Sequence, residues 1–161
     1  MSQAGSEQTP TYTALEQTAA NEGGIDMPDW NKPLPTIVGE TKPYWDACRQ
    51  GRLLLQKCDK CSEFQFYPRG ICANCWSNDI QWVQSSGKGT VWTFTVTYQN
   101  RTPGFDEGPY VLALVELEEG IKMFTNIVDC DPGKVEIGMP VEVTFVRAND
   151  QVSVPFFKPA S

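Results

Sequence analysis

The strongest constraint on how this 161-residue chain folds is a pair of Cys-x-x-Cys motifs that hold four of its six cysteines. Each motif can point two sulfurs at one position, and two motifs joined by a short hairpin complete a tetrahedron around a soft divalent ion. The candidate ligands are Cys58, Cys61, Cys72 and Cys75. We expect them to bind zinc, with iron as the alternative, because a site of four thiolates accepts either metal.

A redox dithiol is the other common role of a Cys-x-x-Cys motif. Redox motifs usually begin a helix inside a βαβ unit, where the helix dipole lowers the thiol pKa. In this chain the two motifs instead flank residues 64–67, a segment with the pattern of a strand. Four thiolates also fill a tetrahedral site, so the metal is expected to stabilise the hairpin and not to activate water or substrate.

The other two cysteines, Cys48 and Cys130, lie outside the motifs. We expect both to be small buried residues and not nucleophiles. Cys130 stands between Asp129 and Asp131, whose negative charges would raise its pKa.

The composition excludes several kinds of chemistry. The chain contains no histidine, so it lacks the commonest general base and any Cys-His or Ser-His-Asp arrangement of its own. Its net charge of -7 opposes nonspecific binding to nucleic acid, which depends on cationic side chains. It has neither a basic leader with an apolar run nor a segment near the ~20 apolar residues of a membrane span. We therefore expect a cytoplasmic protein that makes no membrane contact and keeps its thiols reduced.

Three regions are expected along the chain. Residues 1–39 form an extension with too few apolar residues to build a core. It is either a solvated tail or a docking arm, and Met27, Pro28 and Trp30 would anchor such an arm. Residues 40–84 are expected to hold a short helix and the metal-binding hairpin.

The helix is expected over residues 41–50. Thr41 can cap it, Pro43 fits its first turn and Gly51 can end it. A strand over 52–57 then leads into the first cysteine motif.

Residues 85–161 have the two-residue periodicity of β-strands. Strands are expected over 91–98, 110–117, 121–128, 140–148 and 152–157. In the first of them, Trp92, Phe94, Val96 and Tyr98 would share the buried face. Five strands with short turns favour a closed OB-type barrel, in which sheet edges are minimised, and a sandwich is the alternative.

The fold class is therefore mainly β, with an N-terminal extension, a short helix, a metal-binding ribbon and a five-stranded OB-type barrel. We expect a group of aromatic side chains to pack in the core and between ribbon and barrel. They are Trp76, Trp82, Trp92, Phe156 and Phe157.

Several stretches of residues 40–159, taken together, are similar to one known family. They are GRLLLQKCDKC (51–61), YPRGICANC (67–75), SGKGTVWTFTV (86–96), GPYVLALVELEEG (108–120), TNIVDCDP (125–132), IGMPVEV (137–143) and PFFKP (155–159). In this combination the chain resembles the rubredoxin-like zinc-ribbon plus OB-fold proteins that serve as accessory subunits of thiolase-like acyl-CoA enzymes. Its layout is similar to that of the small subunit of benzoylsuccinyl-CoA thiolase, an enzyme of aromatic degradation.

The chain departs from the family pattern in its cysteine turns. Ser62 and Trp76 stand where such ribbons often carry Gly, and Ala73 stands where Pro is common. Gly at the first two positions would relieve a positive φ, so the departures concern turn geometry and leave the ligands in place.

The resemblance implies a non-catalytic or co-catalytic partner of a thiolase-fold subunit in a hetero-oligomeric complex. Such complexes cleave carbon–carbon bonds or transfer acyl groups, and the barrel helps to hold coenzyme A, or a CoA thioester, at the partner's active site. A chain without histidine would have to take its catalytic apparatus from that partner.

The segment 99–110 is long for a connection between two strands, and is either a solvated loop or a lid. As a lid, Arg101 would reach a CoA phosphate or a partner carboxylate, and Phe105 would insert as an apolar anchor. Lys88 and Arg69 are further cations that could approach phosphates, although both also suit ordinary turns.

Two other functions stay open at this point. An OB-fold module with a structural zinc could bind nucleic acid or another protein through its aromatic residues. A four-thiolate site loaded with iron would make the chain a rubredoxin-like electron carrier.

Overall fold

The computed structural model describes residues 30–106 and 108–160, together with the backbone of residues 25–26. Met27 and Pro28, expected to anchor a docking arm, lie outside the described residues. Within the described residues, no helix has both the length and the apolar character needed to cross a bilayer. The boundaries expected between the three regions of the chain stay predictions.

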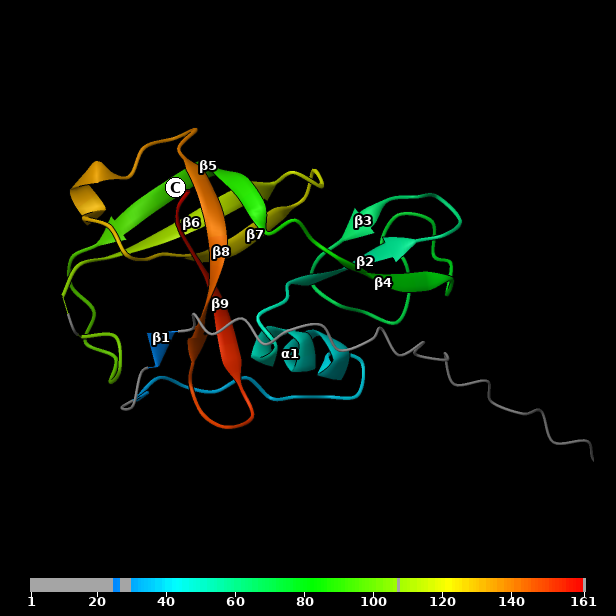
Figure 1. Ribbon diagram of the computed structural model, residues 1–161, viewed down its shortest axis with the longest axis horizontal. Helices are drawn as coiled ribbons and strands as arrows, with labels where there is room; N and C mark the ends of the chain where they lie inside the picture. The colour runs from blue at the N-terminus through cyan, green and yellow to red at the C-terminus, as the bar shows by residue number, and fades with distance from the viewer. Residues whose placement is uncertain (1–24, 27–29, 107, 161) are drawn as a thin grey trace, which may run out of the picture.

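The first part of the structure is a small ribbon that follows one helix (Figure 1). Helix α1 covers Lys42–Arg49, with Pro43 in its first turn and Gly51 just past its end at a φ of 69°. The ribbon sheet has the antiparallel order β3-β2-β4, and its strands are β2 (Leu54–Cys58), β3 (Phe64–Gln65) and β4 (Ile80–Gln84). The helix and the first two strands are close to their predicted places, whereas β4 was not predicted.

The second part is a closed five-stranded barrel, with β1 (Ile25–Asp26) added along one of its strands. Its strands are β5 (Lys88–Thr97), β6 (Tyr110–Leu117), β7 (Lys122–Ile127), β8 (Pro140–Arg147) and β9 (Ser153–Pro159). The hydrogen-bonded order β8-β5-β6-β7-β9 closes through a further pairing of β8 with β9. A short 3-10 helix, Pro132–Lys134, links β7 to β8. This closure confirms the OB-type barrel and excludes the sandwich.

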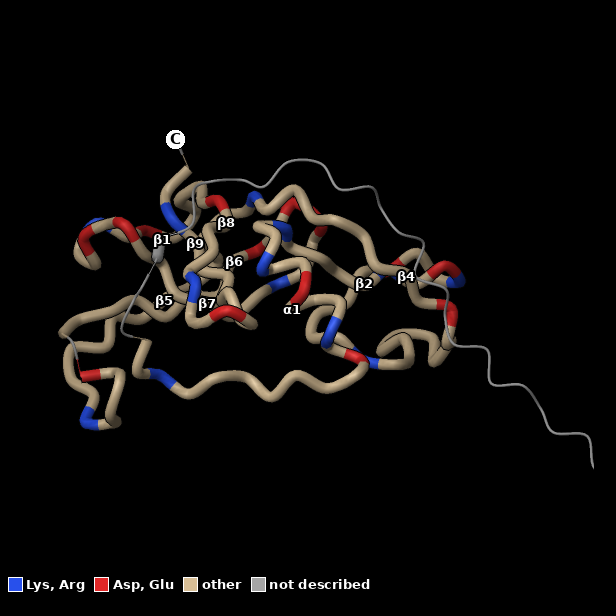
Figure 2. The backbone as a smooth tube through the Cα atoms, turned by 60° about the horizontal axis from the view of Figure 1, so that its bottom comes forward, with Lys and Arg blue, Asp and Glu red and all other residues tan. Residues whose placement is uncertain are grey.

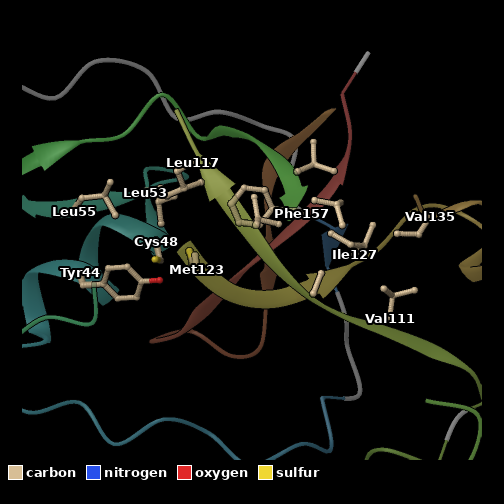
Figure 3. Close-up of a cluster of buried hydrophobic side chains, with 14 residues drawn as sticks. Tyr44, Cys48, Leu53, Leu55, Val111, Leu117, Met123, Ile127, Val135 and Phe157 are labelled. Atoms are coloured by element: carbon tan, nitrogen blue, oxygen red, sulfur yellow. The ribbon is translucent and has the colours of Figure 1, made fainter. Parts of the chain in front are cut away.

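Helix, ribbon and barrel share one hydrophobic core (Figure 3). Tyr44 and Cys48 come from α1, and Leu55 comes from β2. They join barrel residues such as Val115 and Phe157, neither of which has any exposed surface. Because the core runs through both parts, the ribbon is fixed on the barrel by packing as well as by the chain connection.

A bulge in β5 overturns part of the predicted strand pattern. The register between β5 and β6 shifts between Val91 and Thr93. Before the shift, Val91 and Trp92 lie on the opposite faces from those expected, whereas Phe94, after it, packs against the core as expected. Val91 is 1% exposed, whereas Trp92 is 49% exposed and Tyr98, just past the strand, is 73% exposed. The prediction that Trp92 and Tyr98 share a buried face with Phe94 is therefore wrong.

The expectation that the aromatic residues pack inside is correct for only part of the set. Phe157 is fully buried, and Trp82 packs against the core. Trp76 is 76% exposed on the ribbon. Trp92 also lies outside, where the amino group of Lys122 sits 4.8 Å from the centre of its ring.

The segment before α1 lies across the barrel instead of extending away from it. Strand β1 pairs in parallel with the end of β8, with Ile25 opposite Val146 and Asp26 opposite Arg147. Residues 30–38, here called the strap, then run along the molecule to the start of α1 (Figure 1). Beyond Lys32 the strap carries no charged residue (Figure 2).

Candidate metal centre and apolar cavity

The two cysteine motifs fold into two turns with the same hydrogen-bond pattern. In the first, the N–H of Ser62 donates to the carbonyl of Cys58 (2.8 Å), and the N–H of Cys58 donates to the carbonyl of Glu63 (2.9 Å). In the second, Trp76 donates to Cys72 (3.1 Å), and Cys72 donates to Ser77 (2.8 Å). The repeated pattern turns both pairs of sulfurs toward one point.

Both turns require a positive φ at the residue after the second cysteine. Ser62 has a φ of 63° and Trp76 a φ of 62°, at the two positions where related ribbons often carry Gly. The turn geometry is therefore kept without glycine, at a backbone cost of about 1 kcal/mol for each residue.

The four sulfurs form a cluster of the right size for a tetrahedral metal ion. The Cys58 and Cys75 sulfurs are 3.6 Å apart, as are those of Cys61 and Cys72, and all four lie within 4.8 Å of one another. Zn–S bonds of about 2.3 Å give tetrahedral S···S edges of about 3.8 Å, whereas a disulfide needs about 2.05 Å. All six cysteines are free thiols, so the donor set fits a structural zinc.

The thiol chemistry of the cluster also favours a bound cation. A hydrogen bond from the backbone of Glu63 lowers the pKa of Cys61 to about 6. For Cys75, a backbone hydrogen bond from Ser77 lowers the pKa, but burial and the neighbouring thiols outweigh it and raise the pKa to about 12. Ionisation of one thiol thus disfavours ionisation of the next, and a divalent ion removes this repulsion by binding all four sulfurs.

A buried glutamine holds the hairpin between the two motifs. Gln56 is 6% exposed, and its side-chain oxygen accepts hydrogen bonds from the side chain of Gln65 (2.8 Å) and the backbone N–H of Arg69 (2.9 Å). The Gln65 side-chain oxygen accepts from the backbone N–H of Ala73 (2.9 Å). Sequence reasoning missed this pair, whose only signal is a polar residue inside the apolar run of β2.

An apolar cavity of about 700 Å³ lies on the barrel, away from the cysteines. The strap forms one wall, and the β5–β6 loop, residues 98–109, forms another through its residues 104–105 and 108–109. Ile127 of β7, Val154 and Phe156 of β9, and Trp45 of α1 also line it. Sequence reasoning missed this cavity, because its walls come from segments that lie far apart in the chain.

The residues expected to contact CoA do not gather at one place. Phe105 lines the cavity, and Arg101 is exposed on the same loop. Lys88 is the first residue of β5, whereas the loop follows the last residue of that strand. Ten extended residues span about 30 Å, which separates Lys88 from the loop. Arg69 lies on the ribbon, at the far side of the molecule from the loop (Figure 1). A CoA-binding role for each of the four residues stays a prediction.

The two remaining cysteines are poor nucleophiles at neutral pH. Burial raises the pKa of Cys48 to about 12. Burial, with the charges of Asp131 and Asp129, raises the pKa of Cys130 as well. Both therefore stay protonated, as the sequence suggested for Cys130.

Comparison with known proteins begins with two family models that match in order along the chain. Residues 45–81 match the rubredoxin-like zinc ribbon domain of ChsH2, and residues 82–146 match its C-terminal OB-fold domain.

Three relatives show how the matched region is used in other proteins. A probable enoyl-CoA hydratase alpha subunit of Thermomonospora curvata is 38% identical over 129 residues, which are 80% of this chain and 40% of the relative. A DUF35 domain-containing scaffold protein of Methanothermobacter thermautotrophicus is 38% identical over 117 residues, 71% of this chain and 88% of that protein. The benzoylsuccinyl-CoA thiolase subunit BbsA of Geobacter metallireducens is 32% identical over 71 residues, 44% of this chain and 47% of that subunit.

A solved structure, titled Ltp2-ChsH2(DUF35) aldolase, contains a chain that this protein covers completely. The two share 37% sequence identity and superpose with a TM-score of 0.72 over 80% of this chain. By contrast, the chain spans only about 40% of the length of the hydratase subunit. The two domain models, together with the relative that is 38% identical across 88% of its length, show that the chain belongs to the DUF35 family of ChsH2-type zinc-ribbon and OB-fold proteins.

Proposed function

We propose that the protein is an accessory subunit of a multi-subunit acyl-CoA enzyme and contributes no catalytic group of its own. The observation that carries this proposal is the match over the whole of the ChsH2 chain in the Ltp2-ChsH2 aldolase, at 37% identity and a TM-score of 0.72. That chain is one component of a named two-component enzyme, and its fold corresponds to the ribbon and barrel described here.

The chemistry of the chain supports a non-catalytic role. The sequence has no histidine to serve as a base. The four clustered thiols suit a metal that would be fully coordinated, and such a metal cannot bind water or substrate. Cys48 and Cys130 have raised pKa values and are weak nucleophiles at neutral pH.

We further propose that the partner is a thiolase-fold subunit that cleaves or forms carbon–carbon bonds. Two relatives support this choice, since one is named a thiolase subunit and the other is part of an aldolase. Thiolysis uses a cysteine nucleophile assisted by histidine, which the partner would supply. In this complex the barrel would lie beside the partner's active site and help to hold the CoA thioester.

Contact with CoA is proposed at the β5–β6 loop, with Arg101 facing a phosphate and Phe105 providing an apolar contact. We propose that Lys88 and Arg69 are further cations that contact the partner or the ligand in the complex. Because they lie far from the loop, they would act at other points of the partner surface or of a long ligand.

The test of the proposal is purification of the tagged chain from its native cells, followed by identification of the chain that co-elutes. We expect a thiolase-fold protein in a fixed ratio, and acyl-CoA turnover by the complex. The double variant R101A/F105A should weaken CoA binding or assembly, whereas K60A/I137A, which removes one exposed cation and one exposed apolar side chain elsewhere, should not. Recovery of the chain with nucleic acid, or of the chain alone, would contradict the proposal.

A further inference from the structure

We propose that Trp76 is the side chain by which the ribbon docks on the partner subunit, in an apolar pocket whose rim carries Lys and Arg side chains. Naming that partner as the thiolase-fold subunit rests on the proposed function. The role of Trp76 itself rests on the geometry and the surroundings of the second cysteine turn of this chain, residues 72–77.

Trp76 has a strained backbone conformation and gains no burial from it. Its φ is 62°, in the left-handed region that a large L side chain enters only at a cost in backbone free energy. It is 76% exposed, the highest fraction for any large apolar residue in the described part of the chain. No ring among the described residues packs on its indole, and no cation lies over it. Strain without a compensating contact is typical of functional positions.

The first cysteine turn, residues 58–63, shows that this backbone geometry does not require a tryptophan. Ser62 holds the equivalent position with a φ of 63°. Its N–H donates to the carbonyl of Cys58 (2.8 Å), as the N–H of Trp76 donates to that of Cys72 (3.1 Å). A small polar residue is therefore sufficient for the turn, and the large ring at position 76 must have another cause.

The other exposed tryptophan of the described residues differs because it has a partner within the chain. Trp92 is 49% exposed, and the amino group of Lys122 lies 4.8 Å from the centre of its ring. The ring of Trp92 is thus partly covered and holds a cation, whereas that of Trp76 projects from the ribbon alone. Trp92 is accordingly a suitable control for Trp76.

Trp76 offers a protein partner a single compact apolar side chain. A tryptophan can bury up to about 250 Å², so one that is 76% exposed leaves roughly 200 Å² for a pocket on another protein. Tryptophan is enriched among the residues that dominate binding at protein interfaces, where these residues fill desolvated pockets. Because Trp76 directly follows the candidate ligand Cys75, the turn fixes its backbone before binding, which reduces the entropy lost on docking.

Two carboxylates lie beside this turn. The hydroxyl of Ser77, the residue after Trp76, donates a hydrogen bond to the Asp79 carboxylate (2.9 Å). The backbone N–H of Asp59 donates to the carbonyl of Asp79 (2.9 Å), which brings the first cysteine turn alongside. Both aspartates are exposed. Any partner that covers Trp76 therefore approaches a negatively charged surface.

The charges of this surface favour a basic partner over a second copy of the chain. Asp59, Glu63 and Asp79 are exposed with only Lys60 among them, and none of the four forms an ion pair within the described residues. A pocket rimmed by cations complements this excess of negative charge. A second copy, with its own net charge of -7, would be repelled, as would the phosphates of a nucleic acid.

The experiment uses the full chain with bound zinc and the subunit that co-elutes with it, separated and then recombined in a calorimetric titration. W76S gives the second turn the residue that the first turn already has. We expect W76S to weaken binding of the subunit about 30-fold or more, the loss that marks a dominant interface residue. W92S, the control, should stay within two-fold of wild type. Zinc content and the urea midpoint should be unchanged in W76S.

A second variant separates a docking role from a structural one by the sign of its effect. W76G relieves the positive φ, so it should raise the urea midpoint above that of wild type while it weakens binding as W76S does. A residue that served the fold would lower both. D59N/D79N should bind several-fold more weakly at low salt, and its affinity should fall less steeply than that of wild type as salt is added.

Four results would overturn this docking site: W76S binds within two-fold of wild type, W76S loses zinc or urea stability, W92S loses as much affinity as W76S, or the wild-type chain forms a dimer that W76S abolishes. Failure of the proposed function gives different results. A thiolase-fold subunit that binds W76S normally leaves the function intact and removes the docking site. A subunit of another fold that W76S no longer binds does the opposite, and a chain without any partner contradicts both.

Discussion

Replacing Gly104 by alanine should loosen the strap from the barrel, and the effect can be worked out from two features of that position. Gly104 has a φ of 85°, and a Cβ built on it would lie 2.7 Å from the carbonyl oxygen of Asn31. The first feature strains the loop itself, and the second pushes the strap away. G104A therefore tests whether the strap is packed on the loop as described.

The two contributions are of similar size. An L-residue with a positive φ costs about 1 kcal/mol or slightly more relative to glycine. To restore ordinary contact, the Asn31 backbone must also move by roughly 0.7 Å, which loses part of the packing between Trp30 and the cavity walls and costs about another 1 kcal/mol. We expect G104A to lower the free energy of unfolding by about 2 kcal/mol.

The matched control is G120A. Gly120 has a φ of 81° in the β6–β7 turn, but an added Cβ would have no heavy atom within 4 Å. This variant carries the backbone strain without the contact and should lose only about 1 kcal/mol. Urea unfolding measures the free energy of unfolding of both variants. The indole N–H signal of Trp30 in a ¹H–¹⁵N spectrum should move in G104A alone. Equal losses in both variants, with the Trp30 signal unchanged in G104A, would refute this packing.

Further predictions concern the metal, pH and the β5 bulge. C72S should lose its bound zinc, as measured by metal analysis, and should then fail to assemble with the partner, because zinc binding supplies the free energy that folds the ribbon. A metal-free chain that still assembled fully would contradict this. The pKa of Cys48 is raised from 9.0 to about 12, so only the unfolded chain ionises between these values, and stability should fall as pH rises from 9 to 12. In C48A the free energy of unfolding, measured by urea titration at several pH values, should fall less over this range. An equal fall in C48A would mean that other groups cause it, such as Tyr44, whose pKa is also raised by burial. V91A should lower the free energy of unfolding by about 2 kcal/mol and W92A by less than about 1 kcal/mol, because Val91 is buried and Trp92 is half exposed; the reverse order would place the bulge elsewhere.

The features that sequence reasoning found are those set by local patterns. The spacing of the cysteines predicts their cluster, because each Cys-x-x-Cys turn is built from neighbouring residues. The nearly continuous apolar run of β6, Tyr110–Leu117, and the alternation in β8, Pro140–Arg147, predicted both strands nearly to the residue. Pro43 and Gly51 likewise marked the two ends of the short helix.

The features it missed depend on contacts between distant segments. The bulge between Val91 and Thr93 leaves no mark in an alternating sequence, yet it turns Trp92 outward. Strand β4 exists because it pairs with β2 across the metal hairpin. The cavity was missed for the same reason, since Trp30 reaches Phe156 only after the strap has crossed the barrel.

The predicted CoA contacts show where the residue type alone was a weak guide. Arg101, Lys88 and Arg69 were selected for their charge and their expected places in a loop or turn, and the structure spreads them over the loop, the start of β5 and the ribbon. A cation in a turn is common on any protein surface, so only an observed ligand or partner can assign these residues a role.

The most direct test of the central claim is an acyl-CoA turnover assay on three samples: the zinc-loaded chain, the separately purified partner, and the two mixed in a fixed ratio. The account predicts no turnover by this chain, a stable complex in the mixture, and higher turnover by that complex than by the partner alone. Turnover by the chain on its own would contradict the account, as would a partner whose activity is the same with and without the chain.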